Sequence, residues 1–501
     1  MRLHMTFINL VFMLFGTLFA QIPDTIWSKI HDITEDVDIG QCVKQTADSG
    51  YIITGSCVPD GLTSHVDVLL LKTDASGNVE WTQTFDHNFF ENGVSVDQTS
   101  DGGFIIGAIR LMGSYPFIEP PVSDAWIIKT DLNGDTVWTR SINMGGNEYC
   151  TSISQTTDFG FILTGAVNSE SCGPTWEINE LTSPDTGSTW LTKMDFNGNI
   201  VWTKSFFPKS NGNNVIQTSD GGFLITGCIF PDINSNQSDI LLIKTDVNGD
   251  TLWTNAVGTA NYDVGFCIRE TSDGYLVSGQ TKPVGQPYDA LLIITDFGGD
   301  MIWYKIFGGQ LSDAAFNLEV SSDGYYMAGA TNGTWWVTNS ADMWTFKTDL
   351  DGSLLWENIY DINTSDILYS GTLCFDEGYI VTGTTSYGFG GDIWLAKIGT
   401  EVSGVTIYDN QNRVSHYVLS QNYPNPFNPR TKIKYELHEP ILVSVRVYNA
   451  LGEMIVELVN EKKQSGNYEV EFDATEFPSG IYFCRLKTEK YCETRKMVLL
   501  K

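Results

Sequence analysis

Short apolar segments separated by polar turns run through the first 400 residues of the chain. In the stretch 215–253, VIQTSD and GFLITG flank the turn SDGG, and DILLIKTD leads through DVNGD into TLWTN. Runs rich in β-branched and aromatic residues, bounded by Asp, Asn and Gly, predict strands joined by tight hairpins. The alternation in DILLIKT is only partial, which indicates a strand covered on both faces. A unit of this kind predicts four antiparallel strands.

Two signatures recur along this region. The first is a turn that ends in tryptophan, as in KTDLNGDTVW at 129–138, and the second is an Asp-Gly turn followed by Tyr or Phe, as in DGGF at 220–223. The tryptophans of the first are Trp27, Trp81, Trp138, Trp202, Trp253, Trp303 and Trp356. The second recurs at 48–51, 101–104, 158–161, 220–223, 273–275, 323–325 and 376–379. Seven copies of each, with four strands per unit, predict an all-β seven-bladed β-propeller over residues 24–400.

The ends of the repeat region predict how the ring closes. TIWSKI at 25–30 is a tryptophan strand without its partner before the turn, and GGDIWLAKI at 390–398 lacks the tryptophan strand after it. Pairing the two completes one blade and removes an exposed sheet edge. The sequence therefore predicts a ring closed by its first and last strands.

The pattern D-x-x-G-x-x-x-W resembles the tryptophan-docking repeat of quinoprotein-type propellers, with one residue fewer between Asp and Gly. It resembles the Asp-box of sialidase propellers only superficially, because both spacings differ. The resemblance implies a secreted bacterial β-propeller in which the tryptophans pack between neighbouring blades. No cofactor site is evident in it.

Residues 417–501 differ from the repeats in composition. The whole chain carries a net charge of −32, whereas this segment has 12 basic and 11 acidic side chains, so the acidic excess lies in the repeat region. Residues 401–416 lack the repeat signature and are interpreted as a linker. Short alternating strands after it predict a small Ig-like antiparallel β-sandwich.

This last segment resembles the C-terminal sorting domain of type IX secretion substrates. The matching stretches are YPNPFNP (423–429), VYNALGE (447–453), FDA (472–474), SGIYF (479–483) and the terminal KMVLLK. The candidate motif residues are Pro424, Asn425, Pro426, Gly452, Gly480 and Lys496. The resemblance implies a Gram-negative bacterium, export through the type IX machinery, and a tail that is generally cleaved while the cargo is released or tethered at the surface.

The N-terminus predicts entry into this route. Residues 1–20 combine a short basic start, an apolar run and a small residue, Ala20, which is typical of a secretory signal peptide. No later apolar run is long enough to span a membrane. We therefore expect a protein secreted or attached to the outer cell surface, and its acidic charge argues against nucleic acid and anionic membranes as partners.

The nine cysteines are scattered, and no CxxC pair occurs. Most are interpreted as small buried apolar residues. Cys484 and Cys492 flank a predicted hairpin turn and are the candidates for a disulfide.

The search for catalytic groups finds no convincing constellation. No His pair has metal-ligand spacing, and there is no GxSxG or glycine-rich phosphate loop. Arg110, Arg140 and Arg269 occupy non-equivalent repeat positions, which argues against the arginine cluster of a sialidase. The turn D-x-N-G-D places its glycine too early for an EF-type calcium loop. No cofactor or metal is therefore predicted, and calcium at an acidic channel stays an unsupported alternative.

Aromatic residues in the variable loops are the candidate ligand-binding groups. In a four-stranded meander the two conserved turns lie on one face of the ring, and the variable connections lie on the other, where binding is usually carried. The candidates are Trp176, Trp335, Trp336, Tyr115, Tyr288 and Tyr387. Such side chains stack on sugar rings, or alternatively pack long loops onto the ring.

The sequence thus predicts an exported propeller that acts as a binding or interaction protein, with a glycan or a surface protein as ligand. A second hypothesis is a secreted glycan-degrading hydrolase with two carboxylates in the funnel of the propeller. A third is a structural component of the cell surface.

Overall fold

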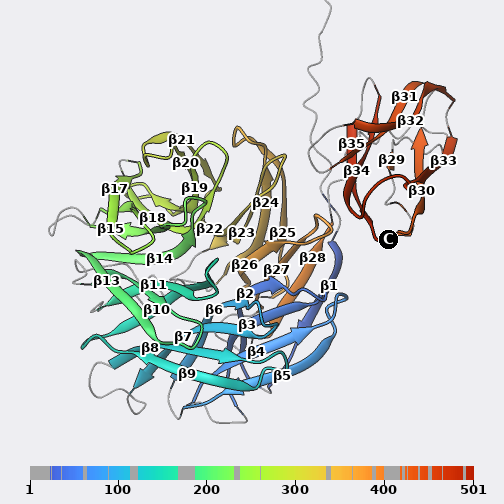
Figure 1. The fold of residues 1–501 in the computed structure, drawn as a ribbon. Coiled ribbons are helices and arrows are strands. Elements are labelled where there is room, and N and C mark those ends of the chain that lie inside the picture. The colour runs from blue at the N-terminus through green and yellow to red at the C-terminus, as the bar shows by residue number, and fades with distance from the viewer. Residues whose placement is uncertain are drawn as a thin grey trace, which may run out of the picture. The chain divides into compact units, whose positions relative to one another are not determined.

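Every regular element in the described residues of the computed structural model is a β-strand (Figure 1). The chain divides into two units, Met1–Thr400 and Glu401–Lys501. The structure describes residues 23, 25–34, 36–59, 65–87, 90–112, 122–167, 187–230, 237–259, 261–333, 340–363, 365–385, 391–399, 418–419, 422, 424–425, 427–437, 441–449, 454–464, 466–488 and 492–501. The predicted signal peptide and the predicted linker lie outside these residues.

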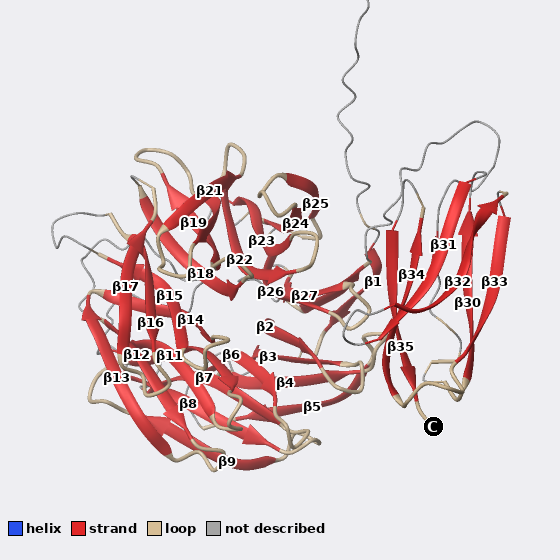
Figure 2. Ribbon diagram, turned by 45° about the horizontal axis from the view of Figure 1, so that its top comes forward, coloured by secondary structure: helices blue, strands red, loops and turns tan. Residues whose placement is uncertain are grey.

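The first unit contains seven four-stranded antiparallel sheets, which are the blades of a propeller (Figure 2). Blade 1 contains β2 (Asp38–Gln45), β3 (Tyr51–Cys57), β4 (Asp67–Thr73) and β5 (Val79–Phe85). Blade 2 contains β6 (Phe90–Gln98), β7 (Phe104–Met112), β8 (Val122–Thr130) and β9 (Thr136–Ile142). Blade 3 contains β10 (Glu148–Gln155), β11 (Phe161–Val167), β12 (Ser188–Met194) and β13 (Ile200–Pro208). Blade 4 contains β14 (Ser210–Gln217), β15 (Phe223–Ile229), β16 (Asp239–Thr245) and β17 (Thr251–Val257). Blade 5 contains β18 (Tyr262–Glu270), β19 (Tyr275–Lys282), β20 (Asp289–Thr295) and β21 (Met301–Phe307). Blade 6 is β22 (Ser312–Val320), β23 (Tyr325–Gly333), β24 (Asp342–Thr348) and β25 (Leu354–Tyr360).

Blade 7 is built from both ends of the repeat region, as predicted. It consists of β26 (Ile367–Leu373), β27 (Tyr379–Thr384), β28 (Ile393–Ile398) and, on its outer edge, β1 (Thr25–His31). In the antiparallel pairing of β1 with β28, Thr25 stands opposite Ile398 and His31 opposite Ile393. The first strand of each blade contacts the first strand of the next, and β26 contacts β2, so the ring is closed.

The repeated tryptophan is the wedge between neighbouring blades. Trp81 of blade 1 lies against Gly134 in the turn of blade 2, where a Cβ atom would stand 2.7 Å from the indole ring and φ is +84°. Its ring centroid is 5.9 Å from that of Phe104, the aromatic residue of the second signature. The same tryptophan–glycine contact recurs for Trp27–Gly77, Trp138–Gly198, Trp202–Gly249, Trp253–Gly299 and Trp303–Gly352. The two signatures therefore recur together because one packs on the other at these six blade junctions.

A buried lysine joins the two conserved turns within a blade. Lys244 of β16 is almost fully buried, and its Nζ lies 2.8 Å from Oδ2 of Asp220 in the turn between β14 and β15. It also donates to the carbonyl of Thr245 at 3.1 Å. The equivalent pairs are Lys72–Asp48, Lys129–Asp101, Lys193–Asp158, Lys347–Asp323 and Lys397–Asp376. In blade 5, Ile294 occupies the lysine position, so this blade lacks the pair.

These pairs predict how stability depends on pH. Although partial burial acts to raise it, hydrogen bonds from Lys244, Thr218 and Gly222 lower the pKa of Asp220 to about 2. Because the ordinary value is 3.8, ionised Asp220 stabilises the fold fully above about pH 4, and this contribution is lost between about pH 4 and pH 2. We expect the difference in unfolding free energy between the wild type and Asp220→Asn to be constant above about pH 4 and to shrink below it. Urea titrations at several pH values measure it; a difference that persists unchanged to about pH 2 contradicts the assignment.

The second unit is a two-sheet antiparallel sandwich. One sheet contains β29 (Val418–Leu419), β30 (Arg430–Leu437) and β33 (Gly466–Asp473), and the other contains β31 (Ile441–Asn449), β32 (Met454–Lys463), β34 (Gly480–Lys487) and β35 (Cys492–Leu499). Both sheets contribute to one core, in which Tyr435 and Phe472 from the first pack with Val445, Leu486 and Met497 from the second. The fold class is therefore confirmed at the level of a β-sandwich, and its Ig-like character stays a prediction.

The predicted Cys484–Cys492 disulfide is wrong. Cys484 carries a free thiol, which is buried in the core of the sandwich. In the register of β34 with β35 it stands opposite Arg495, whereas Cys492 stands opposite Lys487. The two cysteines are therefore three residue pairs apart along the hairpin, which is beyond the reach of a disulfide.

Candidate functional site

The described cavity that all seven blades share is the central channel of the propeller, lined by the first strand of each blade. Each of these strands carries a β-bulge near its beginning, for example between Gly40 and Cys42 in β2 and between Gly265 and Cys267 in β18. A bulge lets two successive residues oppose a single partner residue. Two neighbouring side chains per strand line the channel as a result, followed by a third two residues later.

The channel side chains form three layers. The loop layer, nearest the start of the strands, contains Gln41, Val94, Thr151, Asn213, Phe266, Phe316 and Tyr369. The middle layer contains Cys42, Ser95, Ser152, Asn214, Cys267, Asn317 and Ser370. The turn layer contains Lys44, Asp97, Ser154, Ile216, Arg269, Glu319 and Thr372. The cavity that they line has a volume of about 340 Å³.

The middle layer holds the ring together. Ser95 exchanges hydrogen bonds with the backbone of Ile153 in the next blade, both at 3.2 Å. Asn214 accepts from the N–H of Ile268 at 3.1 Å, and Ser370 accepts from the N–H of Val43 at 3.3 Å. Small side chains with a hydrogen-bonding atom recur in this layer because most of them bind the backbone of the next strand, whereas Asn317 accepts a hydrogen bond from the hydroxyl of Tyr379 at 3.2 Å. This layer is scaffold.

The turn layer concentrates the charges of the channel. Arg269 holds Glu319 in a two-pronged contact, with Nη2 to Oε1 at 2.9 Å and Nε to Oε2 at 3.4 Å. Burial acts to raise the pKa of Glu319, but the charge of Arg269 outweighs it and the pKa is lowered. Glu319 is therefore an ionised, fully engaged carboxylate and a poor proton donor.

Asp97 and Lys44 are the other two charges of this layer. Burial raises the pKa of Asp97, opposed by the charge of Lys44 and by a hydrogen bond from the N–H of Gln155 at 3.0 Å. Among the described residues, no carboxylate lies within ion-pair distance of Lys44. Asp97 is thus the channel carboxylate whose pKa is raised, whereas the pKa of Glu319 is lowered.

The loop layer has an aromatic side and a polar side. Phe316 lies between Phe266 and Tyr369, with ring centroids 5.2 and 6.2 Å away, and these three come from blades 5 to 7. On the other side are Gln41 from blade 1 and Asn213 from blade 4. Nε2 of Gln41 is buried and has no hydrogen-bond partner among the described residues. This layer therefore has aromatic rings on one side and amide groups on the other. Nδ2 of Asn213 donates to the carbonyl of Gly265 at 2.8 Å, so the unsatisfied amide is that of Gln41.

Most of the aromatic residues predicted to bind ligand lie outside the described residues; these are Tyr115, Trp176, Trp335, Trp336 and Tyr387. Tyr288 is described and only 8% exposed. Its ring packs at 6.1 Å from that of Tyr262, and the ammonium of Lys282 lies 4.5 Å from its centroid. A role of this residue in ligand binding stays a prediction.

The three arginines considered for a sialidase-like cluster belong to different surroundings. Arg110 pairs with Asp124 inside blade 2, at 2.8 Å. Arg140 on the outer strand of that blade donates to the carbonyl of Thr139 at 2.8 Å and lies 5.6 Å from the centroid of Trp138. Arg269 alone faces the channel.

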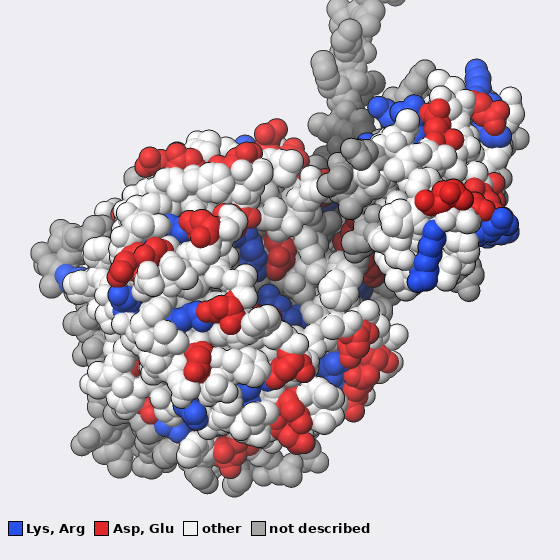
Figure 3. Space-filling model, viewed as in Figure 1, with Lys and Arg blue, Asp and Glu red and all other residues white. Residues whose placement is uncertain are grey.

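Acidic residues begin the first strand in most blades, where they cap the incoming loop. Asp38 accepts hydrogen bonds from the N–H groups of Ile33 and Thr34 at 2.6 and 2.9 Å. Equivalent bonds to loop N–H groups are made by Glu148, Asp263, Asp313 and Asp366. Elsewhere on the face shown in Figure 3, acidic side chains are scattered over the propeller rather than gathered in one patch.

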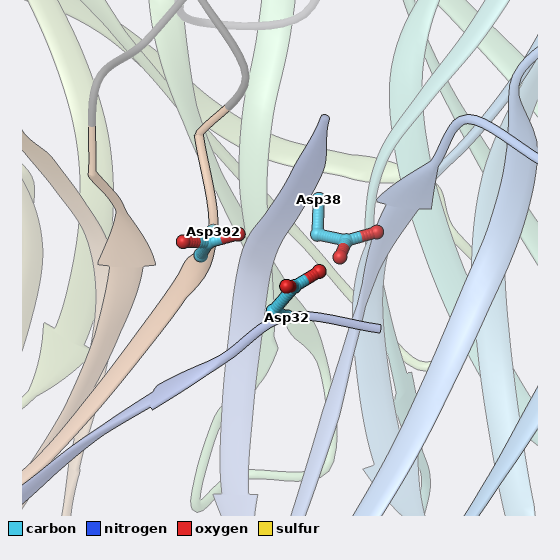
Figure 4. A group of neighbouring side chains, drawn as sticks. All are labelled: Asp32, Asp38 and Asp392. Carbon is cyan, nitrogen blue, oxygen red and sulfur yellow. The ribbon is translucent and has the colours of Figure 1, made fainter. Parts of the chain in front are cut away.

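Three carboxylates, one of them that of Asp38, meet where the ring closes. Asp32 follows β1, Asp38 begins β2 and Asp392 precedes β28 (Figure 4). One carboxylate oxygen of each lies within 4.8 Å of the others. Burial, together with the charge of Asp32, raises the pKa of both Asp38 and Asp392. Since Asp38 is occupied as a loop cap, we assign this cluster a structural role.

In the second unit, the described sorting-motif residues lie in the loop that precedes β30, at the start of β34 and within β35. Oδ1 of Asn425 accepts the N–H of Val498 at 2.8 Å, which ties the YPNPFNP segment to β35. Pro424 is exposed and Gly480 begins β34. Pro426 and Gly452 lie outside the described residues, and so does the side chain of Lys496.

Comparison with known proteins identifies this second unit. Residues 421–500 match the family described as the secretion system C-terminal sorting domain. No curated protein matches the chain. Among the described residues there is no helix long and apolar enough to cross a bilayer.

Three solved structures are among those similar to this chain, all with TM-scores below 0.5. PorZ, an essential surface component of the type IX secretion system of Porphyromonas gingivalis, has a TM-score of 0.43 at 11% identity, covering 91% of this chain and 58% of PorZ. Puromycin hydrolase has a TM-score of 0.44 at 10% identity, with 81% and 60% covered. A putative 6-phosphogluconolactonase from Bacteroides fragilis NCTC 9343 has a TM-score of 0.38 at 12% identity, with 64% and 87% covered. The chain thus spans less than two thirds of the first two proteins, and no function is transferred from any of the three.

The sorting domain makes this a secreted or outer-surface β-propeller protein that interacts with the type IX secretion machinery.

Proposed function

We propose that this exported propeller is a binding protein that takes a small polar ligand, a glycan in the first place, in the loop layer of its channel. The observation that carries the proposal is the two-sided lining of that layer. Phe316 is half-buried and flanked by two further aromatic rings. Gln41 offers a buried amide N–H₂ without a partner among the described residues.

This lining matches the chemistry of a sugar ring. The C–H face of a pyranose stacks on an aromatic ring, while its hydroxyl groups need amide and hydroxyl partners. A cavity of about 340 Å³ lies within the usual range for small-molecule sites. The rigid ring of seven sheets holds both sides of the site in place, which limits the entropy lost on binding.

A binding experiment tests the proposal. The purified protein is screened on a glycan array, with and without calcium, and each hit is measured by calorimetry with Phe316→Ala and Gln41→Ala. Each variant should weaken binding about tenfold, because it removes a stacking surface or a hydrogen bond worth about 1 to 1.5 kcal/mol. Phe159→Ala, in an exposed turn at the end of β10, is the control and should bind like the wild type.

Two other outcomes would contradict a glycan site in the loop layer. Binding that both channel variants leave unchanged places the ligand elsewhere on the protein. An array without a single hit argues against a glycan and favours a protein partner or a structural role at the surface.

The hydrolase remains the second candidate because of Asp97. Its half-buried carboxyl with a raised pKa is the kind of group that protonates a leaving oxygen, whereas Glu319 is held ionised by Arg269. Product analysis after binding decides between the two. If Asp97→Asn abolishes product while ligand is still bound, the protein is an enzyme; without product from the wild type, the binding function stands.

A further inference from the structure

Three carboxylates meet where blade 1 joins blade 2. Asp67 begins β4, Asp86 follows β5 and Glu91 lies in β6. One carboxylate oxygen of each lies within 4.8 Å of the others. The N–H of Glu91 donates to the carbonyl of Val66 at 2.7 Å, so the segments that carry these acids are fixed to one another by the backbone.

Asp67 has a buried carboxylate oxygen without a hydrogen-bond partner among the described residues. This oxygen is Oδ1, and the residue is only 6% exposed. Burial and the charge of Asp86 raise the pKa of Asp67, and the charge of His65 acts in the opposite direction. Asp38 at the ring closure differs, because its carboxylate accepts three hydrogen bonds from residues 33 and 34. A cation beside it stabilises the ionised form of a buried carboxylate that lacks such partners.

The next blade pairs the acid at this position with a cation. Asp124 occupies in β8 the place that Asp67 occupies in β4, six residues before the threonine that ends each strand, and the residue opposite it in the sheet is Arg110. Nη2 of Arg110 lies 2.8 Å from one carboxylate oxygen of Asp124, and Asn143 donates to the other at 3.0 Å. In blade 1, the residue opposite Asp67 is Cys57, a neutral thiol whose pKa burial and the charges of Asp38 and Asp67 raise to about 12. Blade 1 therefore has a neutral thiol at the position where blade 2 places a guanidinium.

We propose that Asp67, Asp86 and Glu91 bind a calcium ion that joins blade 1 to blade 2. Calcium takes carboxylate oxygens at about 2.3–2.6 Å, so ligands on opposite sides of the ion stand about 4.8 Å apart. The spread of the three oxygens suits this ion better than magnesium, whose shorter bonds at about 2.0–2.1 Å require a tighter cluster. Asp86 is exposed and provides the way in, while Asp67 and Glu91 are buried.

Calorimetry with calcium chloride tests the site on the purified full chain after EDTA treatment and dialysis. The wild type should bind saturably, with an affinity in the range of extracellular modules, at about 10⁻⁴–10⁻³ M. Asp86→Asn should weaken binding at least tenfold. Asp32→Asn is the matched control, since it removes an exposed acid from the cluster at the ring closure, and it should bind like the wild type. Absence of binding by the wild type, or equal binding by Asp86→Asn, overturns the proposal.

Asp67→Asn separates a calcium ligand from a residue that merely packs. In EDTA this variant should unfold at the same temperature as the wild type or higher, because it removes an unpaired buried charge. In excess calcium the wild type should gain about 2–4 °C and the variant should gain nothing. A variant that is destabilised in EDTA and still gains stability from calcium overturns the assignment, and magnesium chloride in place of calcium should give the smaller gain.

Discussion

Removal of residues 417–501 should hold the protein in the periplasm of a host that has a type IX secretion pathway. The sorting domain spans residues 421–500, and the propeller has its own closed ring and its own cores. The truncated chain should therefore fold and still be absent from the cell surface and the medium. Immunoblots of periplasmic, surface and medium fractions measure this, and the expected effect is complete loss of export.

Two checks make the truncation decisive. Glu461→Gln changes an exposed side chain of the same unit and should be exported like the wild type. Thermal unfolding of the truncated protein recovered from the periplasm should show a folded propeller. Full export of the truncated chain would show that the propeller reaches the surface without its sorting domain.

The largest loss of stability from one substitution in a conserved turn is expected for Asp220→Ala. Lys244 is 3% exposed, and its ammonium loses its ion-pair partner while it stays buried. An uncompensated buried charge of this kind costs about 3 kcal/mol. The midpoint of urea unfolding should fall accordingly, and circular dichroism or tryptophan fluorescence measures it.

Blade 5 contains the matched control. Its turn acid, Asp273, is exposed, and Ile294 replaces the lysine. Asp273→Ala should therefore change stability by less than about 0.5 kcal/mol, as an ordinary surface substitution does. Adding Lys244→Ile to Asp220→Ala copies the natural arrangement of blade 5 and should recover much of the loss. Equal destabilisation by Asp220→Ala and Asp273→Ala would show that the buried lysine is not the cause.

The propeller could be predicted from sequence because its signals are local. The Asp, Asn and Gly residues of each turn determine its conformation locally. One repeated tryptophan occurs in each blade, so the seven tryptophans give the number of blades. The unpaired strand at Trp27 predicted the closing blade for the same reason. The partner of each wedge was harder to find, because Gly134 and Trp81 lie in different blades and only the fold brings them together.

The channel could not be predicted because its residues occupy equivalent positions in different repeats but have chemically different side chains. Lys44, Asp97, Arg269 and Glu319 occupy one layer, yet they lie in four separate repeats with no common motif. Aligning the first strands of the repeats offers a signal: polar residues recur where a strand buried on both faces should be apolar. The prediction of ligand-binding residues went to aromatic residues in the loops instead, although one of them, Tyr288, packs against the ring of Tyr262.

The pairing of β1 with β28 also sets the order in which the propeller can fold. The pair Thr25–Ile398 has the greatest sequence separation in the sheet ladders of the unit. Thr25 therefore cannot pair with Ile398 until the chain of all the intervening blades has been synthesised. Until then the outer edge of β28 and both edges of β1 are open to pairing with other chains. Contacts between such distant residues form slowly. A chain that crosses a membrane N-terminus first therefore completes its ring only when the last repeat has emerged, shortly before the sorting domain itself.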